Sequence, residues 1–125
     1  IEQRQLLSNV RKMGQLLKDL LSERFQDHAY VGDIRGRGLF RAVELVRDKR
    51  TKEPFDPESA LYAQVKRESM ARRLIIYPGG GTADGKKGDH VLIAPPFIAD
   101  EKHIHQIVDR VGEAIDASIL QIQQF

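Results

Sequence analysis

The residues with the clearest chemical potential lie in one glycine-rich polar stretch, residues 77–89, which reads YPGGGTADGKKGD. Glycine has no Cβ and adopts positive φ readily, so such a segment can bring backbone N–H groups close to a small ligand. Thr82 offers a hydroxyl, and Lys86 and Lys87 offer two positive charges, for contact with an anionic group. The stretch therefore predicts a binding element for a small anion. The alternative is a long hairpin connection that is polar because it faces water.

A second glycine-rich run, RGRG at residues 35–38, connects two apolar, strand-like segments. Its alternating glycines predict a β-bulge, or backbone held against a neighbouring element. Phosphate binding by this run is a weaker alternative, because no GxGxxG or P-loop pattern surrounds it. We expect Arg37 and Gly38 to have structural roles near the ligand site.

Glu44 lies inside the second of these strand-like segments. An unpaired carboxylate would be costly among apolar residues, so we expect Arg35 or Arg37 to pair with it. A structural ion pair near the site is the first interpretation of Glu44, and a catalytic carboxylate is the second.

The histidines and serines do not form a recognisable catalytic or metal-binding pattern. His103 and His105 are two residues apart on a predicted helix and therefore point to different faces. His90 stands alone at a predicted strand edge, and the chain has no cysteine. No serine follows a strand in the sharp turn that exposes a nucleophile. We predict no metal site and no complete catalytic set in this chain.

Composition favours one compact domain, since the 125 residues are 41% hydrophobic and 30% charged. The 20 basic and 18 acidic side chains nearly balance, which argues against nucleic acid as a partner. No apolar run approaches the ~20 residues of a membrane span, and no signal peptide is recognisable. The absence of cysteine suits a cytoplasmic protein. Because Ile1 opens directly into a helical pattern, we expect the chain to be part of a longer polypeptide.

Three helices are predicted from apolar periodicity and capping residues. The first, at residues 2–25, has a stripe formed by Leu6, Val10, Met13, Leu17, Leu20 and Leu21. The second starts at Asp56-Pro57-Glu58, runs to about residue 72 and buries Leu61, Val65 and Met70. The third is capped by Asp100, and its stripe consists of Ile104, Ile107, Val108, Val111, Ile115, Ile119 and Ile122.

Four short strands are predicted at residues 30–34, 39–46, 74–77 and 91–94, the last two ended by Pro78 and by Pro95-Pro96. No helix separates the members of either pair, which favours antiparallel pairing. The predicted fold class is α+β, a small, mostly antiparallel sheet of three to four strands packed by helices, in the order α-β-β-α-β-β-α.

Five segments also carry a resemblance to a known family. They are residues 31–40 (VGDIRGRGLF), 43–46 (VELV), 52–55 (KEPF), 74–78 (LIIYP) and 89–97 (DHVLIAPPF). In this order they resemble the C-terminal part of class III aminotransferases, which are pyridoxal-phosphate enzymes of fold type I. The resemblance covers nearly the whole chain.

The resemblance implies that residues 1–125 form the small C-terminal domain of a longer transaminase, with a long helix at 1–25 and the sheet and covering helices at 30–125. The missing large domain would hold the Schiff-base lysine and most contacts to pyridoxal 5'-phosphate, so no catalytic residue is expected in this fragment, which should be inactive alone. The intact enzyme would be a homodimer that moves an amino group from an amino acid or amine to a keto acid or aldehyde. The small domain would shape substrate specificity.

Two positions depart from the family pattern in a way that concerns the substrate. Tyr77 and Leu92 stand where many relatives carry an arginine that binds a substrate carboxylate, and neither can replace the bidentate guanidinium. Either Lys86, Lys87 or an arginine elsewhere binds that carboxylate, or the substrate is an amine without one. The resemblance thus makes Tyr77, Thr82, Lys86, Lys87 and Leu92 the candidate substrate-binding residues.

Arg73 is a further departure, because the family usually has glycine there. A non-glycine residue in left-handed conformation costs ~1 kcal/mol, so we expect this turn to differ. Two alternatives to the enzyme interpretation remain: a stand-alone α+β module that binds a small ligand without catalysis, and a purely structural dimerisation domain.

Overall fold

The computed structural model describes residues 3–74, 76–80, 88–96 and 99–123. The helices are α1 (Gln3–Phe25), α2 (Leu61–Ala71) and α3 (Glu101–Gln123), with a short 3-10 helix at Pro57–Ser59. The strands are β1 (Val31–Arg37), β2 (Phe40–Leu45), β3 (Tyr77–Gly80) and β4 (Asp89–Ile93). The predicted α+β class and the order α-β-β-α-β-β-α are confirmed. None of the described helices is long and apolar enough to cross a membrane.

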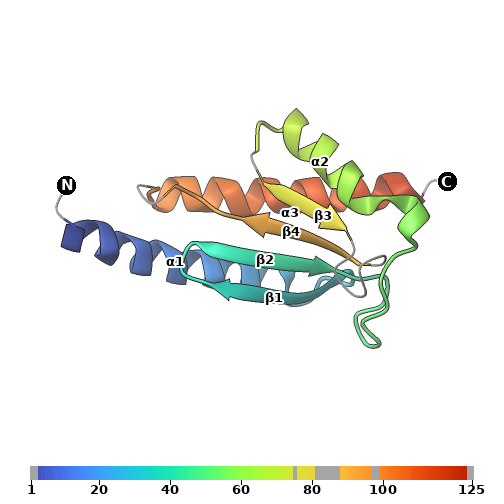
Figure 1. The fold of residues 1–125 in the computed structure, drawn as a ribbon, viewed down its shortest axis with the longest axis horizontal. Coiled ribbons are helices and arrows are strands. Elements are labelled where there is room, and N and C mark those ends of the chain that lie inside the picture. Colours follow the sequence, from blue (N-terminus) through green and yellow to red (C-terminus); the bar gives the residue numbers. More distant parts are fainter. Residues whose placement is uncertain (1–2, 75, 81–87, 97–98, 124–125) are drawn as a thin grey trace.

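The four strands form one antiparallel sheet in the order β1-β2-β4-β3. Figure 1 shows α1 and α3 behind the sheet, while α2 packs against α3 and the edge strand β3. In the described part of the chain the opposite sheet face carries no helix, and we call it the bare face. The fold therefore has two layers, with one sheet face buried and the other open.

The hydrophobic core lies between the sheet and the helices α1 and α3. It contains Met13, Leu17, Leu21 and Phe25 from α1, Val43, Leu45, Val91 and Ile93 from the sheet, and Ile104, Val108, Val111, Ile115 and Ile119 from α3. Alternate sheet residues point inward, and the helices contribute one apolar stripe each, as their periodicity predicts. Asp100 accepts a hydrogen bond from the His103 N–H at 2.9 Å, which confirms it as the cap of α3.

The RGRG run extends β1 and leads into a tight turn that is pressed against α1. Gly38 has a φ of +51°, and a Cβ added at Gly14 would lie 2.7 Å from its Cα and carbonyl carbon. The Arg41 guanidinium fixes the turn by donating to the Gly38 and Gly36 carbonyls at 2.9 and 3.0 Å. The predicted close approach of backbone to a neighbour is thus confirmed. The register shift of this strand lies elsewhere, between Val31 and Asp33.

The predicted helix at residues 56–72 is interrupted. Asp56 caps only the 3-10 helix, through a hydrogen bond from the Glu58 N–H, and Ala60 with a φ of +48° separates it from α2. The prediction that Met70 is buried is wrong, because its side chain is 68% exposed. Ser69 occupies the buried position, where its hydroxyl donates to the Val65 carbonyl at 2.6 Å.

The second strand pair differs from its prediction at both strands. β3 begins at Tyr77 and continues through Pro78, whereas we expected a strand at 74–77 that stops there. An edge strand tolerates proline because one side of it needs no ladder hydrogen bonds. His90 is not at an edge, since β4 lies between β2 and β3.

A polar cluster joins the end of α1 to α3. Asp116 accepts hydrogen bonds from Arg24 at 2.7 Å and from His28 Nε2 at 2.6 Å. Burial alone would raise the pKa of Asp116, but these hydrogen bonds and charges outweigh it and lower the pKa below its ordinary value. Ionised Asp116 therefore stabilises the fold above the ordinary carboxyl pKa, and the contribution disappears as the pH falls through the lowered value.

The contact between Gly14 and Gly38 predicts a specific sensitivity to one methyl group. Gly14→Ala should destabilise the protein by about 1–3 kcal/mol, although alanine favours a helix, because its Cβ would collide with backbone that cannot move cheaply. Thermal denaturation followed by circular dichroism measures the effect. Ser8→Ala, at an exposed position of α1, is the control and should be neutral or slightly stabilising.

The Asp116 cluster predicts a pH-dependent effect. Asp116→Asn should lower the melting temperature at pH 7, and the difference from the unmodified protein should shrink as the pH falls through the lowered pKa of Asp116, below which both proteins carry an uncharged side chain. Asp109→Asn, at an exposed site of the same helix, should show no such trend. A difference that stays constant with pH would contradict the assignment.

Candidate functional site

Tyr77 and Leu92 lie directly opposite one another on β3 and β4. Residues paired in this way share one sheet face and have Cβ atoms about 4.5–5.5 Å apart. Leu92 is also paired with Ala42 of β2, so the row Ala42-Leu92-Tyr77 crosses three strands of the bare face. Tyr77 is 57% exposed, and Leu92 is half-buried. The two positions singled out in the sequence are therefore neighbours on an open surface.

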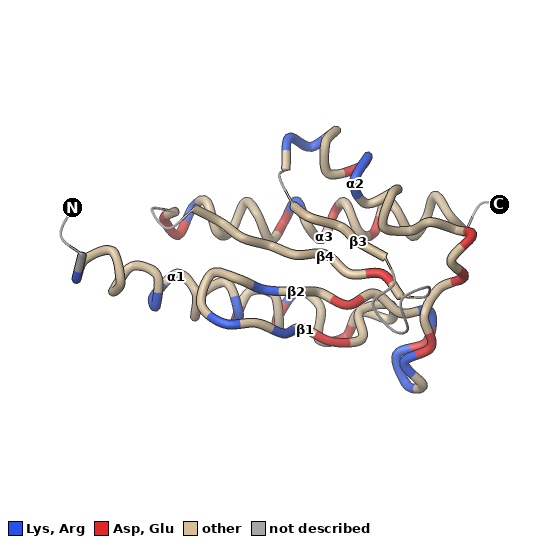
Figure 2. Tube along the Cα trace, viewed as in Figure 1, with Lys and Arg blue, Asp and Glu red and all other residues tan. Residues whose placement is uncertain are grey.

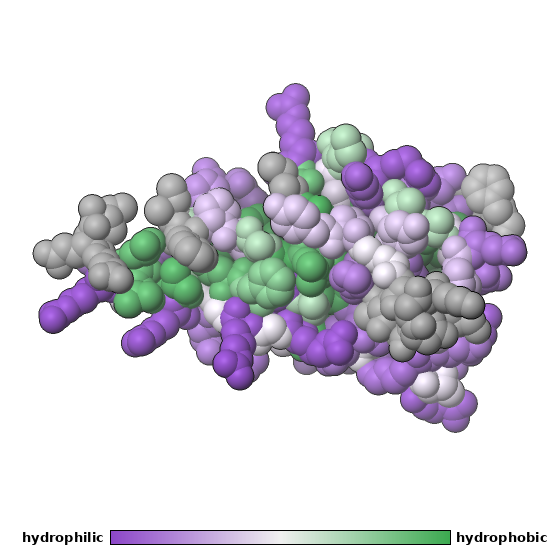
Figure 3. Space-filling model, in the orientation of Figure 1, coloured by the Kyte–Doolittle hydropathy of each residue, from purple (hydrophilic) through white to green (hydrophobic). Residues whose placement is uncertain are grey.

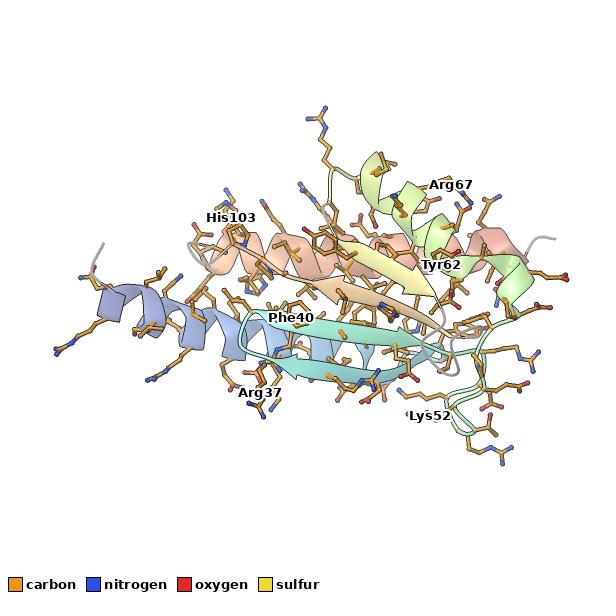
Figure 4. The ribbon with its side chains drawn as sticks, in the orientation of Figure 1. Arg37, Phe40, Lys52, Tyr62, Arg67 and His103 are labelled. Carbon is orange, nitrogen blue, oxygen red and sulfur yellow. The ribbon has the colours of Figure 1, made fainter. Side chains whose placement is uncertain are left out.

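Apolar atoms continue beyond this row. Phe40 at the start of β2 is 56% exposed, and Figure 4 shows it on the face turned to the viewer. In Figure 3 green, apolar atoms cover the middle of this face and extend along α1 towards its N-terminal end. The bare face can thus contact the apolar part of a ligand, while the Tyr77 phenol can donate or accept a hydrogen bond.

Charged residues occupy the same face towards the other edge of the sheet. Arg35 Nη2 donates to Glu44 Oε2 at 3.0 Å, and Arg35 Nε lies 3.5 Å from Asp33 Oδ2. This confirms an ion pair for Glu44, with Arg35 and not Arg37 as its partner. Along β1 and β2 the arginines gather near the hairpin turn and the carboxylates near the opposite end, as Figure 2 shows.

Glycines in β3 allow two rings to approach its backbone. A Cβ added at Gly79 would lie 2.8 Å from His90 Cε1 and Nε2, and one added at Gly80 would lie 2.9 Å from Tyr62 Cε1. Figure 4 shows Tyr62 on α2, beside the strand pair. Gly79 and Gly80 therefore leave room for rings where any side chain would collide.

Asp89 links this strand pair to α2. Its carboxylate accepts a hydrogen bond from the Tyr62 N–H at 3.1 Å, at the first turn of a helix whose own cap, Ala60, makes no side-chain bond. Burial raises the pKa of Asp89, although the hydrogen bond from Tyr62 and the charge of His90 act in the opposite direction. Sequence reasoning missed Tyr62 and Asp89, which are 27 residues apart.

Three of the candidate residues, Thr82, Lys86 and Lys87, lie outside the described residues, and their roles remain predictions. Arg73 adopts a left-handed φ of +56°, so the expectation that this turn would differ is wrong. In the described residues no three His, Cys, Asp or Glu side chains could hold a metal ion together.

A cavity of about 440 Å³ lies away from the Tyr77-Leu92 pair. It is bounded by the end of β4, the segment at Ala94–Pro96 and one side of α3, and its lining includes Arg73, His103 and Arg110. Neither Tyr77 nor Leu92 lines it.

The lysines of the described residues do not suit a Schiff-base role. Lys12, Lys18, Lys49, Lys52, Lys66 and Lys102 are exposed or half-buried, and none is fully buried as the enclosed Schiff-base lysine of a cofactor site would be. The described part of the chain thus does not fit pyridoxal phosphate by itself.

The chain resembles transaminases in both sequence and structure. It is 40% identical over 114 residues to an uncharacterised aminotransferase of Schizosaccharomyces pombe, and 37% identical over 122 residues to the taurine–pyruvate aminotransferase of Rhodobacter capsulatus. These matches cover 91% and 98% of this chain but 25% of each relative. The chain therefore spans about a quarter of the length of the curated relatives it matches.

Solved structures agree with these sequence matches. A transaminase from the marine bacterium Virgibacillus superposes with a TM-score of 0.85 at 26% identity, over 94% of this chain and 26% of that one. The ω-transaminase of Pseudomonas jessenii in complex with PMP superposes with a TM-score of 0.81 at 32% identity, over 98% and 25%. The family model for class III aminotransferases matches residues 1–115, and the chain accordingly belongs to the class III aminotransferase family.

Proposed function

We propose that the intact protein is a transaminase that moves an amino group from an amino acid or amine donor to a keto acid or aldehyde. The observation that carries this proposal is the class III family match across residues 1–115. The similarity to taurine–pyruvate aminotransferases and ω-transaminases supports the same reaction class.

Pyridoxal 5'-phosphate is the proposed cofactor, bound by a large domain outside these residues. It supplies an electron sink for the carbanion that forms when the donor loses its proton. The structure of a relative in complex with PMP supports this cofactor, and the surface lysines of the present chain support a binding site elsewhere in the protein. On the same family basis we propose a cytoplasmic homodimer.

The described residues would form a small domain that contributes specificity and no catalytic residue. The bare face offers an aromatic and apolar surface at Tyr77 and Leu92, with no guanidinium at either position. Such a surface favours a donor whose far end is apolar or uncharged over one that ends in a carboxylate. Thr82, Lys86 and Lys87 are proposed to modify this preference from the neighbouring loop.

The cofactor proposal predicts a spectroscopic result. The full-length protein should show the visible absorption band of bound pyridoxal phosphate, and borohydride reduction should abolish the band and attach the cofactor to a lysine outside residues 1–125. Lys86→Ala and Lys87→Ala should retain the band. A full-length protein without it, or attachment to a lysine of this chain identified by peptide mass spectrometry, would contradict the proposal.

The specificity proposal predicts a change of preference when a guanidinium is introduced. Tyr77→Arg should raise kcat/KM for 4-aminobutyrate relative to propan-2-amine by about tenfold or more, since a charge-assisted bidentate contact becomes available to the carboxylate. Initial rates with pyruvate as acceptor measure the ratio.

Met70→Arg is the matched control, because it adds the same charge at an exposed position of α2. An equal change of the ratio in Met70→Arg would indicate a general electrostatic effect, and no change in either variant would remove Tyr77 from the site.

A further inference from the structure

β3 is a poor strand by its own sequence. It has four residues, YPGG, and lies at the edge of the sheet. Pro78 has no N–H to donate, and Gly79 and Gly80 lose more backbone freedom on folding than other residues would. Among the described strands β3 pairs with β4 alone, yet Tyr77 needs a fixed position if it is to discriminate between substrates.

Two rings provide additional support. His90 on β4 contacts Gly79 directly across the ladder, at a position where a Cβ would be 2.8 Å from the imidazole. Tyr62 on α2 contacts Gly80 from outside the sheet, at 2.9 and 3.0 Å from its would-be Cβ. The backbone of β3 is therefore confined by one ring on each of its two glycines.

Tyr62 also holds the second strand. Its N–H donates to Asp89, which is the ladder partner of Gly80. One residue of α2 thus contacts both strands at the same level of the ladder, three residues from the Tyr77-Leu92 pair at the other end. Three residues of strand span about 10 Å, so the contacts at Gly79 and Gly80 lie close to Tyr77 along the same strand.

We propose that Tyr62 and His90 are positioning residues that determine donor specificity by fixing β3, and with it the Tyr77 side chain. The inference rests on the proposed function, because it concerns the same substrate surface. Neither residue needs to contact the substrate, since each acts through the backbone of Gly79 or Gly80. Removal of a ring leaves space into which β3 can move, and the surface around Tyr77 then accepts larger donors.

The test uses the full-length enzyme, with pyruvate as acceptor and propan-2-amine and 1-phenylethylamine as donors. Tyr62→Ala and His90→Ala should each raise kcat/KM for the bulky donor relative to the small one by roughly tenfold, mainly through KM. Tyr62→Phe keeps the ring and should stay within about twofold of the unmodified enzyme. Met70→Ala, exposed on the same helix, should also leave the ratio unchanged.

A double-mutant cycle separates a positioning role of Tyr62 from a general destabilisation of the domain. Gly80→Ala alone should change the ratio of kcat/KM for the bulky donor to kcat/KM for the small donor, because the added Cβ collides with the Tyr62 ring. In the Tyr62→Ala background the collision is gone, so the same substitution should have a much smaller effect. If the effects of the two substitutions on the donor ratio are additive, the inference is overturned. It is also overturned if the donor ratio follows the melting temperature across all variants.

The outcome for Tyr77→Ala distinguishes the two proposals. A changed donor ratio in Tyr77→Ala with no change in Tyr62→Ala and His90→Ala refutes the positioning role and leaves the specificity surface intact. An unchanged ratio in all three variants refutes both.

Discussion

The fold depends on the close approach of α1 to its neighbours, which two glycines permit. Gly14 meets the backbone of Gly38 at the hairpin turn, and Gly112 of α3 leaves space for the Arg24 guanidinium. Arg41 and Arg24 then use that proximity, the first by binding hairpin carbonyls and the second by pairing with Asp116. With α1 placed in this way, its apolar stripe packs against one face of the sheet.

Burial of one sheet face leaves the other exposed, and the proposed specificity surface lies on that exposed face. The period of two sends Val43, Val91 and Ile93 into the core and turns Glu44, His90 and Leu92 outward. Packing requirements therefore fix the inward residues of each strand, while the outward residues are free of that requirement. The chain belongs to the class III aminotransferase family, and solved transaminases share its fold.

Sequence reasoning succeeded where the information is local. Helical stripes, the Asp100 cap and the Arg35-Glu44 pair all follow from spacing of a few residues or from the cost of a buried charge. It failed at Met70, because the buried stripe of Leu61 and Val65 continues at Ser69, four residues further on, and Met70 is rotated about 100° away from it around the helix. Tyr62 and Asp89 were missed because their contact depends on how α2 lies across the sheet, which no local pattern encodes.

The two outer strands of the sheet also affect how the domain behaves among other chains. Exposed strand edges are templates for strand addition and hence for aggregation. On one edge, Pro78 removes a donor and two glycines follow it, so an incoming strand gains little there. The other edge, β1, has a register shift after Val31 and carries Asp33, Arg35 and Arg37. The strand that carries Tyr77 is therefore a poor template for another polypeptide.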